Sequence, residues 1–275
     1  TGESMRGALK YISYGKEIIK GRLANKSIPV FVTLCVTNRC NLRCRYCYED
    51  YYDRNHREFT TEEITSLIDE LYSMGTRYIS INGGEALLRK DIEVIIDKVV
   101  EKNILCHLST NGLLVPKKIN TLKKLDSIAI SIDGSRECND LNRGEGSYDK
   151  IIEAFESLKE NNIKFHTHTV LTKNNKKAVD EIMELAPRYG FMSQFSILRA
   201  EDSPNKQINL SDNEIRETIK KIIEYKEQGY PIFFSLSSYR NAMNWPFSYD
   251  KQMVLDESES GKKMDCYLKR LSCHI

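Results

Sequence analysis

The chain has 275 residues, of which 40% are hydrophobic and 29% charged, as in an ordinary globular protein. Its 41 basic and 39 acidic side chains leave a formal charge of +2, which argues against a nucleic-acid binder that must neutralise many phosphates. No apolar run approaches the roughly 20 residues that span a bilayer, and the first residues do not form a secretory signal. We therefore expect no transmembrane segment and a cytoplasmic location.

The predicted elements begin with a basic helical extension over residues 1–28. A buried strand is predicted over residues 29–37, because this stretch is short, apolar and β-branched. A cysteine-rich loop follows it. Thr60 then begins a helix with a hydroxyl cap, first-turn acids and apolar residues at helical spacing, and Gly75 ends that helix.

The same strand-and-helix pattern then repeats along the chain. Further strands are predicted at 77–82, 104–110, 126–133, 163–171 and 191–199, and helices at 91–102, 116–124, 147–160 and 176–189. Strands that alternate with helices indicate right-handed crossovers and a parallel sheet. Six such units fit either a doubly wound sheet or a partial barrel.

The fourth predicted strand favours the barrel. It alternates large apolar residues at positions 128, 130 and 132 with Ala129, Ser131 and Asp133. The large residues would pack on helices, and the small or polar ones would face a lumen. We therefore predict the α/β class, a partial (β/α)6 TIM-like barrel with a short irregular C-terminal extension.

The predicted domain boundaries follow from this pattern. The barrel core spans residues 29–200, and a helix at 211–228 with a strand at 231–235 completes its side within residues 201–235. Residues 236–275 form a C-terminal extension in which no clear repeat is found.

Three of the eight cysteines, Cys40, Cys44 and Cys47, fall within eight residues directly after the first strand. Clustered cysteines in a long chain without a secretory signal bind metal more often than they form disulfides. Three ligands would leave one iron of a 4Fe–4S cluster open for a substrate or cofactor. The alternative is a structural zinc site, with Cys35 or His56 as the fourth ligand.

The motif Cys-x3-Cys-x-aromatic-Cys after a first strand resembles the signature of the radical S-adenosylmethionine (radical SAM) superfamily, and the resemblance covers about residues 29–200. It implies a 4Fe–4S cluster whose open iron binds S-adenosylmethionine, and reductive cleavage of that cofactor to methionine and a 5′-deoxyadenosyl radical. It also implies an external one-electron donor of the flavodoxin or ferredoxin type.

Gly83, Gly84 and Glu85 end the second predicted strand and resemble the family's Gly-Gly-Glu-Pro motif, which binds the methionine amino group. Ala86 replaces the usual proline, so the loop is expected to be less stiff. Without the resemblance, a Gly-Gly turn between a strand and a helix explains the same residues.

Polar pairs end the third and fourth strands: Ser109 with Asn111, and Ser131 with Asp133. The resemblance assigns Ser131 and Asp133 to the ribose of the cofactor. Turn chemistry at the strand ends is the alternative for both pairs.

Two more cofactor contacts are implied. Tyr46 matches the family's aromatic position near the adenine, and Arg143 lies where some relatives carry an arginine for the methionine carboxylate. A solvated loop charge is the alternative for Arg143. His166, His168 and Arg199 are weaker candidates on the substrate side, and the histidines could instead be covered by a helix.

Cys266 and Cys273 lie close to the last residue of the chain. Cys266 resembles the first ligand of a SPASM or twitch extension, which binds auxiliary iron–sulfur clusters. The hairpin and later cysteines of such an extension are absent from this sequence, and two cysteines cannot supply four ligands, so an auxiliary cluster is left open.

The substrate follows least directly from the sequence. The C-terminal cysteine favours modification of a peptide or protein. The alternatives are a small-molecule or lipid-directed enzyme of the hopanoid-related type, which the basic helix at 14–22 suggests, and a non-catalytic zinc-binding protein.

Overall fold

The computed structural model describes residues 2–47, 57–199, 204–243, 256–257 and 263–264. The helices are α1 (Gly2–Ala24), α2 (Thr61–Met74), α3 (Ile92–Glu101), α4 (Ile119–Leu122), α5 (Arg136–Arg143), α6 (Ser147–Glu160), α7 (Ala178–Tyr189), α8 (Asp212–Glu227) and α9 (Leu236–Ala242). The short 3-10 helices are η1 (Ala86–Leu88), η2 (Val115–Lys118), η3 (Lys173–Asn175) and η4 (Pro204–Ile208). The strands are β1 (Phe31–Cys35), β2 (Tyr78–Asn82), β3 (Leu105–Thr110), β4 (Ser127–Ser131), β5 (His166–Leu171), β6 (Met192–Ile197), β7 (Asp256–Glu257) and β8 (Lys263–Met264).

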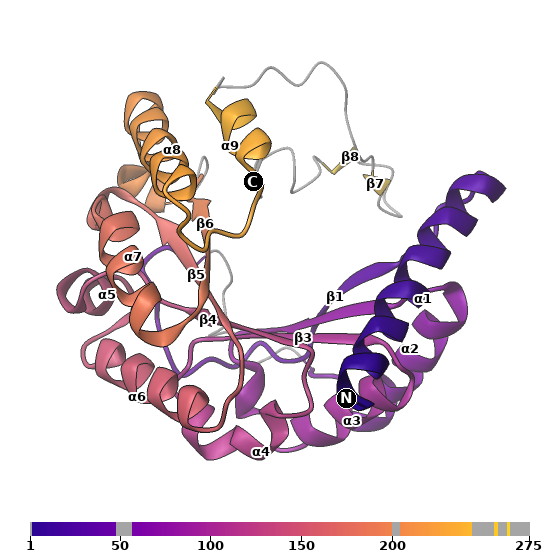
Figure 1. Cartoon of the computed structure of the whole chain (residues 1–275). Coiled ribbons are helices and arrows are strands. Elements are labelled where there is room, and N and C mark those ends of the chain that lie inside the picture. Colours follow the sequence, from indigo (N-terminus) through magenta and orange to yellow (C-terminus); the bar gives the residue numbers. More distant parts are fainter. Residues whose placement is uncertain (1, 48–56, 200–203, 244–255, 258–262, 265–275) are drawn as a thin grey trace. The chain divides into compact units, whose positions relative to one another are not determined.

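Strands β1 to β6 form one sheet in which each strand neighbours the next along the chain (Figure 1). The pairs β1–β2, β2–β3 and β3–β4 are parallel, and Cys35 at the end of β1 lies opposite Asn82 at the end of β2. The alternation of six strands with helices confirms the predicted α/β class.

The chain divides into two compact units. The first contains Thr1–Arg43, Glu49–Ser131 and Asp149–His166, and the second contains Cys44–Tyr48, Ile132–Tyr148 and Thr167–Ile275.

The first unit has its core between its strands and the helices that follow them. Helix α3 packs on α2 and on β3 (Figure 1). Ile68 of α2, Ile96 of α3 and Ile79 of β2 are fully buried. A capping box begins α2, because the Thr60 hydroxyl accepts from the backbone of Glu63, whose carboxylate accepts from Thr60 N.

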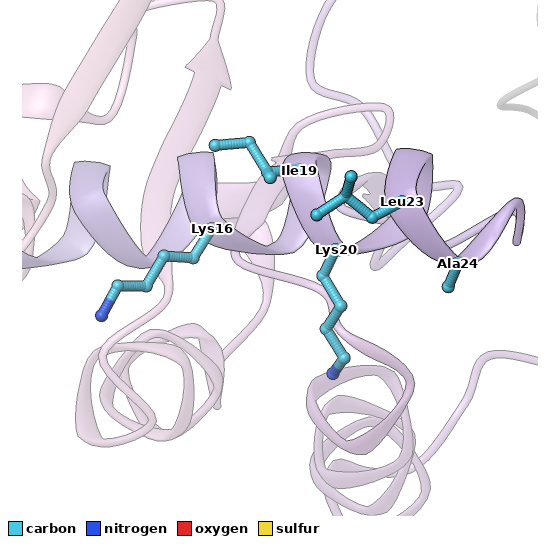
Figure 2. A pocket seen from close by; sticks show the side chains of 5 residues that line it. All are labelled: Lys16, Ile19, Lys20, Leu23 and Ala24. Atoms are coloured by element: carbon cyan, nitrogen blue, oxygen red, sulfur yellow. The ribbon is translucent and has the colours of Figure 1, made fainter.

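Two ion pairs join helix α1 to the rest of the first unit. Lys10 forms a 2.7 Å ion pair with Asp126, and Glu17 lies 3.2 Å from Arg77. Side chains of another face line a shallow surface depression, shown in Figure 2: Lys16, Ile19, Lys20, Leu23 and Ala24. No helix in the described part of the chain is long and apolar enough to cross a membrane.

The second unit is built around β6, α7, α8 and α9. Helix α8 packs on both α7 and α9. Asp180 of α7 pairs with Lys221 at 2.6 Å and accepts from the Tyr225 hydroxyl at 2.9 Å, so polar bonds join α7 to α8.

Three features of the second unit differ from the predictions. Residues 231–235 form no strand, since only Ile232 makes an isolated parallel bridge with Ser193, and the prediction of a strand there is wrong. Ser235 instead caps α9, which was not predicted. Helix α5 was also not predicted, because its buried residues are polar and leave no apolar period to detect.

Candidate functional site

In the first unit, the segment after β1 lies against the glycine pair after β2. Gly84 N donates to Thr37 O at 2.9 Å, and Glu85 N donates to Arg39 O at 2.8 Å. A Cβ atom on Gly84 would lie 2.4 Å from the Arg39 carbonyl oxygen, so a larger residue would displace the backbone. The glycine therefore permits the close approach of two backbones beside Cys40.

The Cys40 thiol is half-buried, and Leu42 N donates to its sulfur at 3.4 Å. Burial raises the pKa of the thiol above its usual 9.0; the Leu42 N–H opposes this rise and the charge of Glu85 adds to it. Binding of a metal cation reverses this balance, because a coordinating thiol loses its proton.

Glu85 is almost wholly buried, with 1% exposure. Its carboxylate accepts from Leu87 N at 3.0 Å, Thr110 Oγ1 at 2.8 Å and Asn111 N at 2.7 Å. Burial raises the pKa of Glu85 above 4.5, although the three hydrogen bonds oppose it. A carboxylate has about four acceptor positions, so one remains for another donor.

Asn111 connects the end of β3 to the cysteine segment. Its Nδ2 donates to Asn41 Oδ1 at 2.8 Å, and its Oδ1 accepts from Leu113 N at 3.1 Å. Asn41 is the residue after Cys40. Neither Asn41 nor Thr110 was a candidate from the sequence, because isolated polar residues carry no spacing signal.

In the second unit, Cys44 and Cys47 belong to one turn, in which Cys47 N donates to Cys44 O at 3.0 Å. Both thiols are half-buried. Arg45 N donates to the carbonyl of Asn142 at 2.8 Å, and this bond fastens the turn to the last residues of α5.

Asp133 is fully buried, and its carboxylate accepts three hydrogen bonds. Oδ2 accepts from the Tyr46 hydroxyl at 2.7 Å and lies 3.0 Å from Arg143 Nε. Oδ1 accepts from Arg143 Nη2 at 3.1 Å and from Val170 N at 3.3 Å. Arg143 is 5% exposed, so the alternative of a solvated loop charge is wrong.

The charges in this cluster are fixed by burial and by one another. Burial raises the pKa of Tyr46 well above 10. The charge of Asp133 also raises this pKa, whereas the charge of Arg143 lowers it. Burial lowers the pKa of Arg143, but the attraction of Asp133 outweighs it and leaves the pKa above its usual value. Tyr46, which stands between Cys44 and Cys47 in the sequence, therefore carries a neutral phenol. The Arg143 guanidinium lies 5.6 Å from the centre of the Tyr46 ring.

The two serines lie on strands of the first unit. Ser109 Oγ is 3.3 Å from His107 Nε2, and Ser131 is half-buried at the end of β4. The His107 ring stacks on His166 with 5.3 Å between ring centres. Burial lowers the pKa of both histidines to about 4, so they are neutral at pH 7.

The other candidates on the substrate side belong to the second unit. His168 Nε2 lies 2.8 Å from Ser196 Oγ, and Arg199 forms a long ion pair of 3.8 Å with Asp212. Both side chains thus have protein partners in this structure.

Three predicted positions, His56, Cys266 and Cys273, lie outside the described residues. Among the residues the structure does describe, no group of three or more His, Cys, Asp or Glu side chains has the arrangement of a metal site.

A family model described as "Radical SAM superfamily" matches residues 34–186. Fe-coproporphyrin III synthase of Methanosarcina barkeri (strain Fusaro) is 30% identical over 230 residues, 78% of this chain and 57% of that protein. Mycofactocin maturase MftC of Mycolicibacterium smegmatis is 34% identical over 178 residues, 62% of this chain and 45% of that protein. The chain thus spans about half the length of these relatives.

A solved structure with a similar fold is SuiB of Streptococcus suis bound to its precursor peptide SuiA. Its TM-score is 0.67 at 18% identity, covering 86% of this chain and 56% of that one. The similarity confirms the predicted barrel-type α/β fold.

Proposed function

The chain belongs to the radical SAM superfamily, and on that premise we propose that Cys40, Cys44 and Cys47 hold a 4Fe–4S cluster that cleaves S-adenosylmethionine reductively. The observation that carries the proposal is the three-cysteine motif together with a hydrogen-bonded chain beside its first cysteine. In that chain Asn111 donates both to Glu85 and to Asn41, the residue after Cys40. Members of this superfamily are enzymes that use these two cofactors.

The residues fit the cluster by the chemistry of their donors. Three half-buried thiols lie within eight residues, and none of the six described cysteines forms a disulfide. The backbone N–H that Leu42 directs at Cys40 Sγ is the kind of donor that stabilises a coordinating thiolate. When bound, the cluster supplies one electron to break the sulfonium C–S bond of S-adenosylmethionine.

The methionine part of the cofactor would be held by charge. We assign its ammonium to the remaining acceptor position of Glu85, which three donors already orient. Gly83 and Gly84 let the ligand approach the backbone. Asn111 fixes the positions of Glu85 and Asn41 relative to each other, because it donates to both. Arg143 is the counter-charge proposed for the carboxylate.

The adenosine part of the cofactor would be contacted by polar side chains. In the proposal, Tyr46 contacts the adenine, and Ser109 and Ser131 offer hydroxyls to the cofactor. The Asp133 carboxylate accepts from Tyr46, Arg143 and Val170, which leaves one of its roughly four acceptor positions. We assign that position to the ribose, while Asp133 also orients Tyr46 and Arg143.

For the substrate we propose a peptide or protein, because MftC is named a maturase and SuiB was solved with its precursor peptide. A small molecule is the second candidate, because a relative that matches 78% of this chain is named Fe-coproporphyrin III synthase. In either case, an external one-electron donor of the flavodoxin or ferredoxin type is part of the proposal.

The test is anaerobic reconstitution with iron and sulfide, followed by incubation with dithionite and S-adenosylmethionine. We expect a brown protein that releases 5′-deoxyadenosine, measured by liquid chromatography and mass spectrometry. Cys44→Ala should abolish the release, whereas Cys138→Ala, which removes a half-buried thiol outside the motif, should retain it. A colourless protein with one tightly held zinc would refute the proposal.

A further inference from the structure

The three motif cysteines lie in segment 37–59, of which the structure describes residues 37–47 and 57–59. One buried arginine bonds to the backbone at Val36 and at Phe59. Arg89 Nη1 donates to Val36 O at 2.7 Å and to Phe59 O at 3.1 Å. These carbonyls are 53 and 30 residues away from Arg89 along the chain. A single guanidinium nitrogen therefore joins the residue before the segment to its last residue.

The position of the guanidinium is itself fixed. Arg89 is 5% exposed, and its Nε and Nη2 donate to the two carboxylate oxygens of Asp91 at 2.9 and 2.6 Å. Asp91 also accepts from the hydroxyl of Thr61, the first residue of α2, at 2.6 Å. Such a bidentate pair restricts the arginine to one orientation.

A second connection links the same two parts of the chain. Glu58 accepts from the Thr37 hydroxyl and from Arg39, whose Nε and Nη2 lie at 3.2 and 2.9 Å. Arg39 directly precedes Cys40, and its carbonyl accepts from Glu85 N at 2.8 Å. Bonds at the base of the segment thus continue to the first cysteine and to Glu85.

A buried arginine could simply stabilise the fold, and Arg77 shows what that looks like here. Arg77 Nη1 also donates to two carbonyls, those of Tyr72 and Thr76, and Nη2 pairs with Glu17. Its carbonyl partners are at most 5 residues away in sequence, so it closes no long segment. Arg89 has the same bonding pattern but spans the cysteine segment.

We propose that Arg89 and Glu58 form a clasp that joins residues 36–39 to residues 58–59 and holds Cys40 in place before any cluster is bound. Arg89 is a positioning residue, because it acts through the backbone and touches no cofactor. The link to cluster binding rests on the proposed function, but the connection between these residues does not.

The primary test uses the cluster-free protein, so it does not depend on the cofactor. Hydrogen–deuterium exchange of the amides at 37–43 is compared between wild type and the variants R89M, R89K, E58Q and R77M. We expect R89M to exchange at least tenfold faster and E58Q a few-fold faster. The exchange rate of R89K should lie between those of R89M and E58Q, since a lysine cannot bond to Asp91 and to both carbonyls at once. R77M is the matched control and should leave these amides unchanged.

The second readout is the reconstituted protein. The rate at which a chelator removes iron should rise in R89M and E58Q but not in R77M, and the electron paramagnetic resonance signal of the reduced protein should broaden. If R89M does not fold, E58Q and R89K decide the question alone, because they leave no uncompensated deletion of a buried charge.

Unchanged exchange at 37–43 in E58Q and R89K would overturn the clasp, and so would an equal increase in R77M. If the wild type takes up no cluster while exchange responds as expected, the proposed function fails and the clasp stands.

Discussion

The carboxylates at the strand ends make more hydrogen bonds within the protein than their sequence motifs suggest. Glu85 and Asp133 were both expected to contact the cofactor, yet each is buried and occupied by donors of the protein itself. Each carboxylate accepts three hydrogen bonds and so keeps about one acceptor position. Asp133 differs in being ion-paired with Arg143.

Asp133→Asn tests the role of Asp133. The amide cannot balance Arg143, which is 5% exposed, so we expect a loss of about 3 kcal/mol in the free energy of unfolding, as when one partner of a buried ion pair is removed. Binding of S-adenosylmethionine to the reconstituted protein should also weaken, because Tyr46 and Arg143 lose their common partner.

The matched control is Asp140→Asn in helix α5, which also carries Arg143. Asp140 accepts from Gly146 N and Tyr148 N, so its loss should lower stability. Cofactor binding, measured by equilibrium dialysis, should stay at the wild-type level. If both variants weakened binding of S-adenosylmethionine equally, Asp133 would affect binding only through the stability of the fold.

Asp91 gives a pH dependence with a definite sign. Its hydrogen bond to Arg89 lowers the pKa from 3.8 to about 2, against the effect of burial. A lowered pKa contributes stability at neutral pH, and that stability is lost as the pH falls from about 5 towards 2. In Asp91→Asn the unfolding midpoint in urea should be lower at pH 7, and it should fall less between pH 5 and pH 3 than in wild type.

The control for this prediction is Asp97→Asn, which removes a half-exposed carboxylate paired with Lys124. Exposed pairs contribute little, so its pH profile should follow wild type. A wild-type slope in Asp91→Asn would show that Asp91 does not couple stability to pH.

At the scale of elements, helices with an apolar period were predictable and helices without one were not. Helix α2 has a cap, a period and a terminal glycine, and the sequence predicted it almost to the residue. Helix α5 buries Asn139, Asn142 and Arg143 instead of apolar residues, so its pattern resembles a loop. The residues that fasten the cysteine turn are on this helix, which is why the turn's partners were missed.

Helix α1 permits a comparison of its two faces. Lys10 pairs with Asp126, which also accepts from Cys106 N at 2.8 Å, and Lys10 is 9% exposed. Lys10→Ala leaves that carboxylate without its cation, so we expect a loss of about 2–3 kcal/mol, near the lower end for a partly buried pair. Leu23 is 84% exposed, and Leu23→Ala should change stability by less than about 0.5 kcal/mol.

Urea denaturation followed by circular dichroism measures both variants. Similar losses in Lys10→Ala and Leu23→Ala would mean that the exposed face of α1 in Figure 2 is packed in solution. An unchanged midpoint in Lys10→Ala would mean that the ion pair does not anchor the helix.

At the scale of the whole molecule, the repeat of strand and helix was enough to predict the fold class and the six strands of the main sheet. Parallel pairing in chain order follows from the helix-containing crossovers between successive strands, which are local features. Bonds such as Arg89 to Val36 join residues 53 apart, and no local pattern encodes them. The motif cysteines were therefore predictable, whereas the network that supports them was visible only in the structure.

The cysteines give a last prediction that concerns the chain as a whole. Cys35 is exposed, Cys40, Cys44 and Cys47 are half-buried, and Cys106 is fully buried. Burial also raises the pKa of Cys106 further above its usual 9.0, so little thiolate forms. Brief treatment with iodoacetamide, mapped by mass spectrometry, should modify Cys35 and the motif cysteines well before Cys106.

Reconstitution should change this order in one way. Ligation would protect Cys40, Cys44 and Cys47 together, while Cys35 and the half-buried Cys138 keep their reactivity. Cys35, the exposed last residue of β1, is the control for access of the reagent. Cys138, which is half-buried like the motif thiols, is the control for burial. Protection of Cys35 with the other three would favour a four-ligand zinc site, since that alternative alone uses Cys35. Protection of the three motif cysteines alone would leave one coordination position for the cofactor.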